Sequence, residues 1–394
     1  MIPEYYEFEN PVRILSGLRA LDNLPYELGR LGVSRPLVIT DPGVAGAGIL
    51  KHVTRAFDDS ATESVTLFDR VPPESSLDTV RELARIYREK GCDCIVAVGG
   101  GSVIDTAKGS NILVTEETDD LGAFVGADLL EKPMKPLVVI PTTSGTGSEV
   151  TVAAMITDTE NHLKLPFTSR FLLPRLAILD PRMTLGLPPA ITAATAMDAM
   201  THAVESYICL QKNPLSDAYG WAAIRLIRAH LIPVLRDGGD ENGRLALANA
   251  SCMAGVAFSN SMVGIVHALG HGCGAACGVP HGVAMNIFLP HGLEYNMAKT
   301  RPLLAELLLH LGGPETYAAT PAGDRAARTV AEIRGLQADI HRITRLPRTL
   351  KEAGIPREKL EIIAEKALGD GALLFNPVGV DYRDALAVVR NAYE

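Results

Sequence analysis

The pattern of apolar residues changes near residue 180, and this change limits the folds open to the chain. Before it, short β-rich runs alternate with amphipathic stretches of helical spacing. Such alternation predicts a parallel, doubly wound α/β sheet. After Asp180 and Pro181 the strand signal stops, and from Pro188 onward only helical periodicity remains. We therefore predict a Rossmann-like α/β domain over residues 1–183 and an all-helical domain over residues 184–394.

The predicted elements follow from this division. The strands are 36–40, 64–68, 94–98, 137–140 and 176–179, with helices over 77–90 and 102–114 between them. The helices of the second half are 189–210, 214–235, 241–260, 262–276, 281–298, 322–341, 347–353, 356–368 and 382–393. Because a cleft between domains is a common place for a small-molecule site, we expect the active site there.

Composition argues against several classes of protein. The formal net charge is −9 and no cluster of Lys and Arg is present, so a nucleic-acid partner is not expected. No apolar run is long enough to cross a bilayer, and the N-terminus lacks the regions of a signal peptide. We expect a cytoplasmic protein whose six cysteines are reduced thiols.

Carboxylate and imidazole side chains recur at helical spacing in the second half. Asp198 and His202 lie four residues apart in an alanine-rich stretch, and His267 and His271 repeat that spacing. Residues at i and i+4 share a helix face. With His281 in a Pro-His-Gly segment, they could direct one carboxylate and two or three imidazoles at one point, which suits a divalent metal.

Three neighbouring side chains offer alternatives to this ligand set. Cys273 and Cys277 are soft ligands that zinc accepts, but their glycine-rich surroundings and the harder ligands nearby favour ordinary packing. His291 stands in a second Pro-His-Gly segment, and we interpret it as structural.

Glycines and hydroxyls follow the predicted strands of the first half. Gly99-Gly100-Gly101-Ser102 leaves one strand and opens a helix, which is either a pyrophosphate cradle or a tight turn. The segment PTTSGTGSE from Pro141 to Glu149 is either a nucleotide loop or a polar loop with capping hydroxyls. Asp41 ends another strand, where a carboxylate can accept both ribose hydroxyls of NAD or belong to a plain turn.

Taken together, these motifs resemble the iron-containing (group III) alcohol dehydrogenases. The resemblance extends from Asn10-Pro11 to Asn376-Pro377 and rests on several long motifs in the same order. It implies a dehydroquinate synthase-like architecture, an interdomain active site and a homodimer. Two segments depart from familiar members: Val71-Pro72-Pro73-Glu74-Ser75 replaces a common Asn-Pro, and Val378 follows Asn376-Pro377 where Arg is common.

The resemblance also implies a set of site residues. The metal, Fe²⁺ with Zn²⁺ as the alternative, would be held by Asp198, His202, His267 and His281, while His271 would line the site without binding it. The cofactor would be NAD. We predict that NAD contacts Asp41, Gly99, Gly100, Gly101, Ser102, Thr142, Thr143, Thr146, Thr151 and Lys164.

The expected activity is hydride transfer between NAD(H) and a small alcohol, aldehyde or ketone. A divalent cation acidifies a hydroxyl group bound to it, and the nicotinamide ring carries hydride. His271 either relays the proton of the alcohol or is a histidine without proton work. Two alternatives remain open: a hydroxyacid–oxoacid transhydrogenase with tightly bound NAD, and a non-catalytic nucleotide- or metal-binding protein.

Overall fold

The computed structural model describes residues 3–58, 62–161 and 163–394, and the chain forms two compact units. One unit is Asn10–Gly186; the other joins Leu187–Glu394 to the N-terminal segment that ends at Glu9. That segment packs with the helices because Phe8 stacks on Tyr219 at 5.9 Å between ring centroids. The division falls between residues 186 and 187, whereas the sequence places it between residues 183 and 184.

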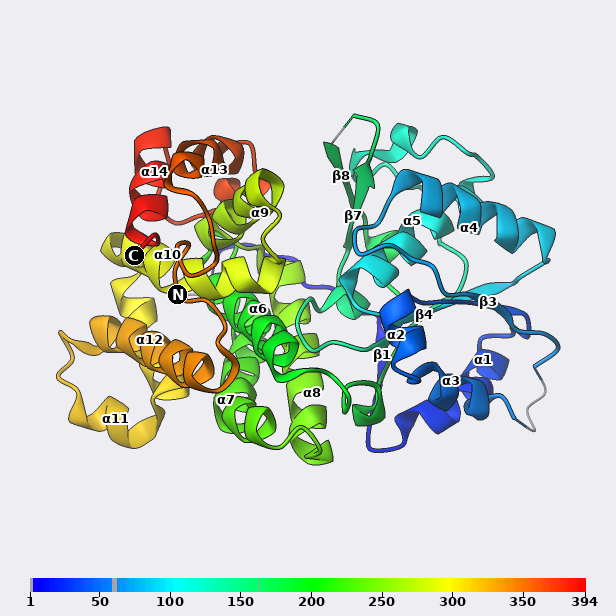
Figure 1. Ribbon diagram of the computed structural model, residues 1–394, viewed down its shortest axis with the longest axis horizontal. Coiled ribbons are helices and arrows are strands. Elements are labelled where there is room, and N and C mark those ends of the chain that lie inside the picture. Colours follow the sequence, from blue (N-terminus) through cyan, green and yellow to red (C-terminus); the bar gives the residue numbers. More distant parts are fainter. Residues whose placement is uncertain (1–2, 59–61, 162) are drawn as a thin grey trace. The chain divides into compact units, whose positions relative to one another are not determined.

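The α/β unit is built on a parallel sheet of six strands in the order β1-β9-β6-β4-β2-β3. Its strands are β1 (Arg13–Ser16), β2 (Pro36–Ile39), β3 (Thr66–Phe68), β4 (Cys94–Gly99), β6 (Leu137–Pro141) and β9 (Leu176–Leu179). Both faces are covered, as the predicted doubly wound fold requires (Figure 1). The carboxyl ends of all six strands lie at one edge of the sheet.

Each face of the sheet has its own apolar core, because successive strand residues point to opposite sides. Leu37 and Ile39 belong to the core under α4 (Leu77–Glu89) and α5 (Gly101–Glu116). Val38 belongs to the opposite core, under α1 (Leu24–Arg30), α2 (Pro42–Gly46) and α3 (Leu50–Ala56). Continuous burial of β2, β4, β6 and β9 explains why these parts of the sequence show apolar runs without alternation.

The sequence analysis missed β1 and a small second sheet. That sheet has the order β5-β8-β7, with β5 (Gly126–Ala127), β7 (Ala153–Asp158) and β8 (Leu163–Thr168). β7 and β8 pair antiparallel, and β8 carries Lys164 and Pro166 among its apolar residues. β1 has four residues and lies at an edge of the main sheet. These strands are short and partly exposed, so their sequences lack the apolar runs by which a strand is recognised.

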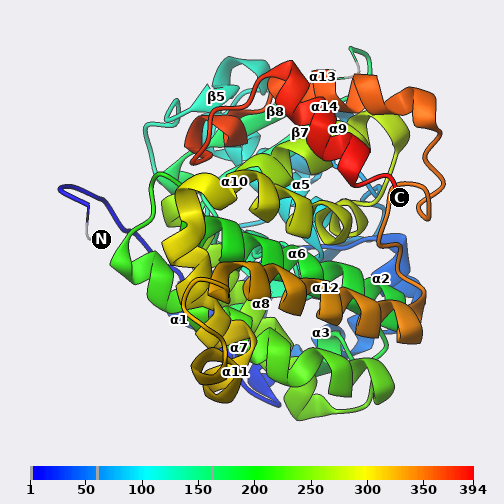
Figure 2. The ribbon, with the colours of Figure 1, turned by 90° about the vertical axis from the view of Figure 1, so that its left-hand side faces the viewer.

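The second unit is helical throughout its described residues (Figure 2). Its long helices pack around α6, which contacts α7, α8, α10 and α12. The helices are α6 (Pro189–Ile208), α7 (Pro214–Arg236), α8 (Glu241–Ser261), α9 (Ile265–Cys277), α10 (His281–Leu311), α11 (Gly313–Ala319), α12 (Arg325–Thr344), α13 (Leu360–Leu368) and α14 (Tyr382–Asn391).

Two predictions for the helical unit were wrong. The helix expected over 281–298 continues to Leu311, through Pro290 and Pro302. A proline removes one backbone hydrogen bond, but packing of Leu304, Leu307 and Leu311 in the core stabilises the longer helix. The helix expected over 347–353 is a series of turns, in which backbone bonds tie residues 350 and 351 to the end of the chain.

No single helix of the described residues is long and apolar enough to cross a membrane. Helices α8 and α9 meet that requirement only as a pair, which is bent by 104° at its break.

Candidate functional site

Helix α6 supplies the first half of the candidate site. Asp198 and His202 lie one turn apart on this helix, and both are buried. The helix forms here because alanine is the best helix former and Pro189 occupies the first turn, where it costs no hydrogen bond. Small alanines also allow close packing, so the polar pair is held inside the helical core.

Helices α9 and α10 bring two histidines to the same place. His267 lies in the first turn of α9, and His281 is the first residue of α10. The chain turns between the two helices at Gly278, which has a φ of +68° that favours glycine. Gly282 then lets α10 approach α6, since a Cβ at this position would lie 2.4 Å from the Ala194 carbonyl oxygen.

The four predicted metal ligands converge. One ligand atom from each of Asp198, His202, His267 and His281 lies within 4.8 Å of the others. Oδ1 of Asp198 is 3.2 Å from Nε2 of His281, 3.7 Å from Nε2 of His202 and 3.9 Å from Nε2 of His267. Ligand atoms about 2.1 Å from a common ion lie roughly 3–4 Å from one another, so these separations suit one divalent ion.

Burial sets the charges of this cluster. It lowers the pKa of His202 to about 3 and that of His267 well below its usual range, so both rings are neutral at neutral pH. Burial alone would raise the pKa of Asp198, but the neighbouring His202 and His281 outweigh it and lower that pKa. Asp198 is therefore a carboxylate and His202 and His267 are neutral imidazoles, which are the protonation states that bind a cation.

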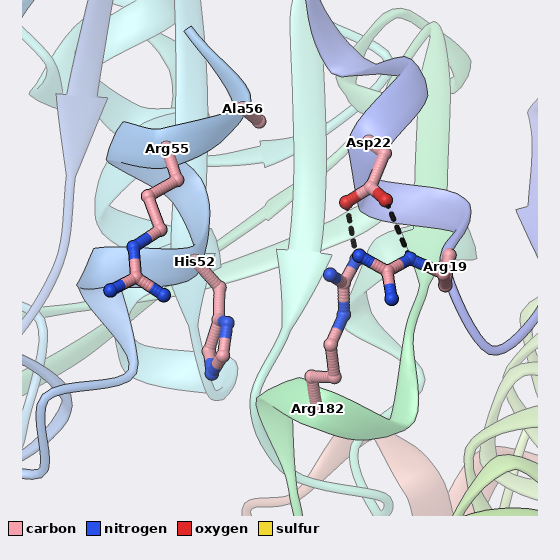
Figure 3. Close-up of a pocket in the computed structure, with 6 residues that line it drawn as sticks. All are labelled: Arg19, Asp22, His52, Arg55, Ala56 and Arg182. Atoms are coloured by element: carbon pink, nitrogen blue, oxygen red, sulfur yellow. Dashed lines mark hydrogen bonds and ion pairs between the residues drawn. The ribbon is translucent and has the colours of Figure 1, made fainter. Parts of the chain in front are cut away.

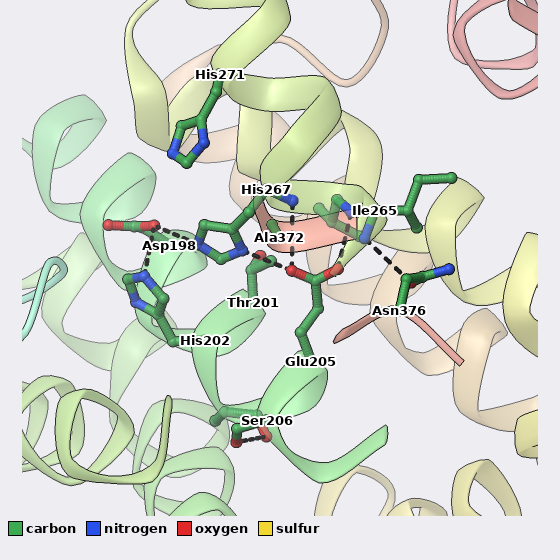
Figure 4. Close-up of polar contacts among 12 residues, drawn as sticks. Asp198, Thr201, His202, Glu205, Ser206, Ile265, His267, His271, Ala372 and Asn376 are labelled. Atoms are coloured by element: carbon green, nitrogen blue, oxygen red, sulfur yellow. Dashed lines mark hydrogen bonds and ion pairs between the residues drawn. The ribbon is translucent and has the colours of Figure 1, made fainter. Parts of the chain in front are cut away.

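Two atoms aimed into the cluster have no hydrogen-bond partner within the described residues. Oδ1 of Asp198 and Nε2 of His267 are buried and unsatisfied. Burying a polar atom without a partner costs about 1–3 kcal/mol, and a charged one costs more. Figure 4 shows the Asp198 carboxylate and the rings of His202 and His267 facing one another. The residues present thus fit a metal ion of the kind the sequence predicts.

Glu205 orients one of the imidazoles and was missed by the sequence analysis. Its Oε2 lies 2.6 Å from Nδ1 of His267, and its Oε1 accepts a hydrogen bond from the backbone N–H of Val266 at 2.8 Å (Figure 4). Because the carboxylate accepts, Nδ1 of His267 must donate, and the lone pair of Nε2 is left facing the cluster. Burial raises the pKa of Glu205 to about 7, against backbone hydrogen bonds that lower it.

Asn376 fixes the start of the helix that carries His267. Its Oδ1 accepts from the backbone N–H of Ile265 at 3.1 Å and from the amide of Asn296 at 2.9 Å. Its amide donates to the carbonyl of Val378 at 2.7 Å, at the position where the family usually has Arg. Asn376 thus has a structural use in this chain: it satisfies a backbone donor at the first turn of α9.

His271 lies beside the four ligands and outside their group. Its ring is nearly parallel to that of His281, with centroids 5.2 Å apart and an interplanar angle of 18°. Nδ1 of His271 is 2.7 Å from Oδ2 of Asp370, and the His271 side chain is 46% exposed. Asp370 therefore orients a solvent-accessible imidazole next to the cluster, an interaction that the sequence analysis did not find.

The other candidate ligands lie elsewhere. Cys273 is buried in the apolar core of the helical unit, and Cys277 is packed against that core. His291 is largely buried on α10, 3.8 Å from Glu294, and burial lowers its pKa to about 4. None of the three belongs to the group of converging ligands.

The predicted cofactor segments occupy one edge of the parallel sheet. Gly99 ends β4 and pairs in register with Pro141 at the end of β6, so the two loops that follow start side by side. A Cβ at Gly100 would lie 3.3 Å from Oγ1 of Thr143, and one at Gly101 would lie 3.0 Å from Cγ2 of Thr146. A larger residue at either position would force the neighbouring threonine side chain to shift by a few tenths of an ångström.

The N-terminus of α5 is open to an anion. Gly100 is its N-cap residue, and no side chain caps the first turn. The Ser102 hydroxyl donates to the carbonyl of Pro73, in the segment that departs from the family pattern. The backbone N–H groups of the first turn therefore remain available for a phosphate group.

The remaining predicted cofactor residues differ in their surroundings. Thr142 is buried, and its backbone N–H donates to the carbonyl of Gly99 at 3.1 Å. Asp41 is the N-cap of α2, where its Oδ1 accepts from the N–H of Val44 at 2.9 Å. Lys164 is on β8, with its side chain 55% exposed and 3.9 Å from a carboxylate oxygen of Glu74.

Lys108 is a fully buried cation beneath these loops, and it too was missed by the sequence analysis. Its Nζ donates to the carbonyl oxygens of Thr151 and Ala153, at 2.7 and 2.8 Å, and to the Thr151 hydroxyl at 3.1 Å. Burial lowers its pKa to about 8, although nearby Asp105 and Glu149 favour the charged form. Lys108 therefore fastens the end of the 141–151 loop to helix α5, and the Thr151 hydroxyl is used in this contact.

Comparison with known proteins agrees with the fold. Residues 11–181 match the family model of iron-containing alcohol dehydrogenase, and residues 192–393 match that of the C-terminal part of the same family. Alcohol dehydrogenase 4 of Saccharomyces cerevisiae is 34% identical over 362 residues, 91% of each chain. The 1,3-propanediol dehydrogenase of Klebsiella pneumoniae is 36% identical over 365 residues, 92% of each chain.

Solved structures give the same result. A 1,3-propanediol oxidoreductase superposes with a TM-score of 0.94 at 35% identity, covering 99% of this chain and 100% of that chain. The sulfoacetaldehyde reductase of Bifidobacterium kashiwanohense, solved in complex with NAD⁺, superposes with a TM-score of 0.85 at 25% identity, covering 99% of each chain. The chain therefore belongs to the iron-containing alcohol dehydrogenase family, and it is an oxidoreductase that acts on alcohols.

Replacing Lys108 tests its part in holding the cofactor loops. Lys108→Met should lower the free energy of unfolding by about 3 kcal/mol, because buried carbonyls lose their donor and buried carboxylates lose their counter-charge. Urea denaturation measures this change, with Lys90→Met, at an exposed position, as the matched control. A loss no larger than that of the control would mean that Lys108 does not stabilise the loop.

Proposed function

We propose that Asp198, His202, His267 and His281 hold one divalent ion, Fe²⁺ with Zn²⁺ as the alternative, and that the protein transfers hydride between NAD(H) and a small alcohol or aldehyde. The observation that carries this proposal is the convergence of four ligand atoms within 4.8 Å in a buried site. When bound, such an ion lowers the pKa of an alcohol hydroxyl or polarises a carbonyl, which is the activation that hydride transfer needs.

The protein's own groups prepare the site for the cation. Buried imidazoles that are already neutral need no deprotonation before they bind metal, so little of the binding free energy is spent on proton release. Glu205 holds the His267 ring in the tautomer that leaves Nε2 free. Three nitrogen ligands and one oxygen suit Fe²⁺ or Zn²⁺.

The same proposal assigns NAD to the sheet edge of the α/β unit. Support comes from the uncapped N-terminus of α5, which offers backbone donors to a pyrophosphate, and from the contact between this turn and the loop that carries Thr143 and Thr146. Oδ1 of Asp41 accepts the hydrogen bond that caps α2, and Oδ2 of Asp41 is left to accept from a ribose hydroxyl. A carboxylate at this place repels a 2′-phosphate, which favours NAD over NADP.

Small alcohols and aldehydes are the proposed substrates. The relatives bear names that range over methanol, 1,3-propanediol, sulfoacetaldehyde and long-chain alcohols, so the shared chemistry is at the hydroxyl or carbonyl group. His271 is proposed to carry the alcohol proton toward solvent. Its support is the exposure of its imidazole next to the ligand cluster and its hydrogen bond to Asp370.

We also propose that the protein works as a homo-oligomer in the cytoplasm. All six cysteines are free of disulfides, as in a reducing compartment. The strand β1 is at an edge of its sheet, with Ile14 37% exposed, and such an edge can pair with another chain.

Metal binding and turnover are tested together. Anaerobically iron-loaded protein should oxidise members of an alcohol panel with NAD⁺, whereas the double variant His267→Ala/His281→Ala should lose both the ion and the activity because two of its ligands are gone. Elemental analysis measures occupancy. The circular dichroism of the variant should show that it remains folded. Full metal occupancy in the double variant would contradict the ligand assignment.

A milder variant separates positioning from coordination. Glu205→Gln puts an amide N–H against Nδ1 of His267 and disfavours the binding tautomer, so metal affinity should fall about 10- to 100-fold. Competition with a chelator measures this affinity. Ser206→Ala is the matched control on the same helix, because within the described residues its hydroxyl donates to the carbonyl of Ala203 and not to the histidine cluster. If the two variants bind the metal with equal affinity, Glu205 does not position His267 for metal binding.

Cofactor choice is tested at Asp41. Asp41→Asn keeps an oxygen for the N–H of Val44 and removes the charge, so the ratio of kcat/KM for NADP⁺ over NAD⁺ should rise about tenfold, equivalent to about 1.4 kcal/mol. Initial rates with both cofactors measure the ratio. Wild-type protein that prefers NADP⁺, or a variant with an unchanged ratio, would show that Asp41 does not select the cofactor.

The proton path is tested at His271. His271→Ala should keep its metal, lose about 100-fold in rate and show an altered pH–rate profile, because the relay has lost its titratable group. Asp370→Asn should give a smaller loss, since the imidazole remains but the carboxylate that orients it is gone. Metal loss in His271→Ala would make this residue a ligand, and full activity with an unchanged profile would make it a packing residue.

A further inference from the structure

The α/β unit contains a cavity that the cofactor and metal proposals do not use. It has a volume of about 460 Å³ and is lined by Arg19, Asp22, His52, Arg55, Ala56 and Arg182 (Figure 3). These residues come from three parts of the unit: the turn after β1, helix α3, and the turn after β9. None of them belongs to the residues predicted to contact NAD. The volume is in the range of small-molecule sites.

One wall of the cavity is a set of paired charges. Asp22 accepts hydrogen bonds from Nε of Arg19 at 2.9 Å and from Nη2 of Arg182 at 2.7 Å (Figure 3). These two guanidinium groups lower the pKa of Asp22, with Arg182 the stronger, so its carboxylate stays ionised. Arg182 is held in turn by Asp180, whose side chain is fully buried. The charges of this wall cancel, because two guanidinium groups face two carboxylates.

The opposite wall is positively charged. His52 and Arg55 are three residues apart on α3 and share a helix face. Figure 3 shows their polar ends across the cavity from the Arg182–Asp22–Arg19 chain. Neither side chain has a hydrogen bond or ion pair in the described part of the chain. With three guanidinium groups against the carboxylates of Asp22 and Asp180, the cavity has one net positive charge in a chain of net charge −9.

We propose that this cavity binds the phosphate group of a small phosphorylated molecule. A guanidinium fork matches the geometry of phosphate oxygens, and an adjacent imidazole adds a further donor. Arg55 and His52 would contact the phosphate, while the paired wall would meet the uncharged part of the ligand through the outer donors of Arg19 and Arg182. The site is separate from hydride transfer, so its failure would leave the proposed dehydrogenase activity unaffected.

Isothermal titration of the full-length protein with inorganic phosphate tests this site at constant ionic strength. Wild-type protein should show saturable binding, and Arg55→Gln should weaken it about tenfold, the effect of losing one charge-assisted hydrogen bond. His52→Asn should also weaken it. Arg383→Gln is the matched control, because it removes an exposed arginine of the helical unit and should leave phosphate affinity unchanged.

Two further measurements test whether the site is selective for phosphate and whether it is separate from the cofactor site. Sodium acetate at equal ionic strength should not compete with phosphate, because a single carboxylate carries less charge. NADH affinity should be the same in wild type and Arg55→Gln. The proposal is overturned if wild-type protein shows no saturable phosphate binding, if Arg55→Gln and Arg383→Gln bind phosphate equally, or if Arg55→Gln loses NADH affinity in parallel, which would make the cavity part of the cofactor site.

Discussion

A buried carboxylate whose ligand-facing oxygen has no hydrogen bond is the constraint on which the helical unit depends. Oδ1 of Asp198 and Nε2 of His267 are enclosed by packed helices and unsatisfied within the described residues. Such atoms are costly to bury unless a cation completes their interactions. The proposed ion would complete the interactions of both atoms, and the packing of the surrounding helices offsets the cost of burying them.

The packing around the cluster shows how this is done. Alanines on α6 and Gly282 on α10 let the two helices approach closely, so ligands from separate helices reach one point. Glu205 fixes the tautomer of His267, and Asn376 satisfies a backbone donor at the start of its helix. The Glu205 contact thus sets the direction of the His267 Nε2 lone pair before a cation arrives. Pre-organisation of this kind lowers the free-energy cost of ordering the side chains when the ion binds.

Much of the fold and of the candidate site could be predicted from the sequence. Four of the five predicted strands were recognisable because burial on both faces produces apolar runs. Three of the four candidate ligands were recognisable because an acid or histidine recurs at i and i+4 in two helical stretches. Glu205 left a usable signal: it follows His202 by three residues on the same face of an apolar helix. Burial of a carboxylate on that face indicates a polar partner.

Other residues left no local signal. Asp370 reaches His271, and Asn376 reaches Ile265, only through tertiary packing across about a hundred residues. Nothing in the sequence around Lys108 distinguishes it from other helix residues, because its contact with Thr151 joins residues far apart in the chain. The length of α10 was missed because its two prolines are tolerated only by packing that the sequence does not show locally.

X-ray absorption at the iron edge of anaerobically loaded protein tests the central claim most directly, because it reports the atoms around the ion. The account predicts a first shell of nitrogen and oxygen at about 2.0–2.2 Å, with the scattering of histidine rings, and no sulfur. A sulfur shell at about 2.3 Å, or a shell of water oxygens without histidine, would contradict it.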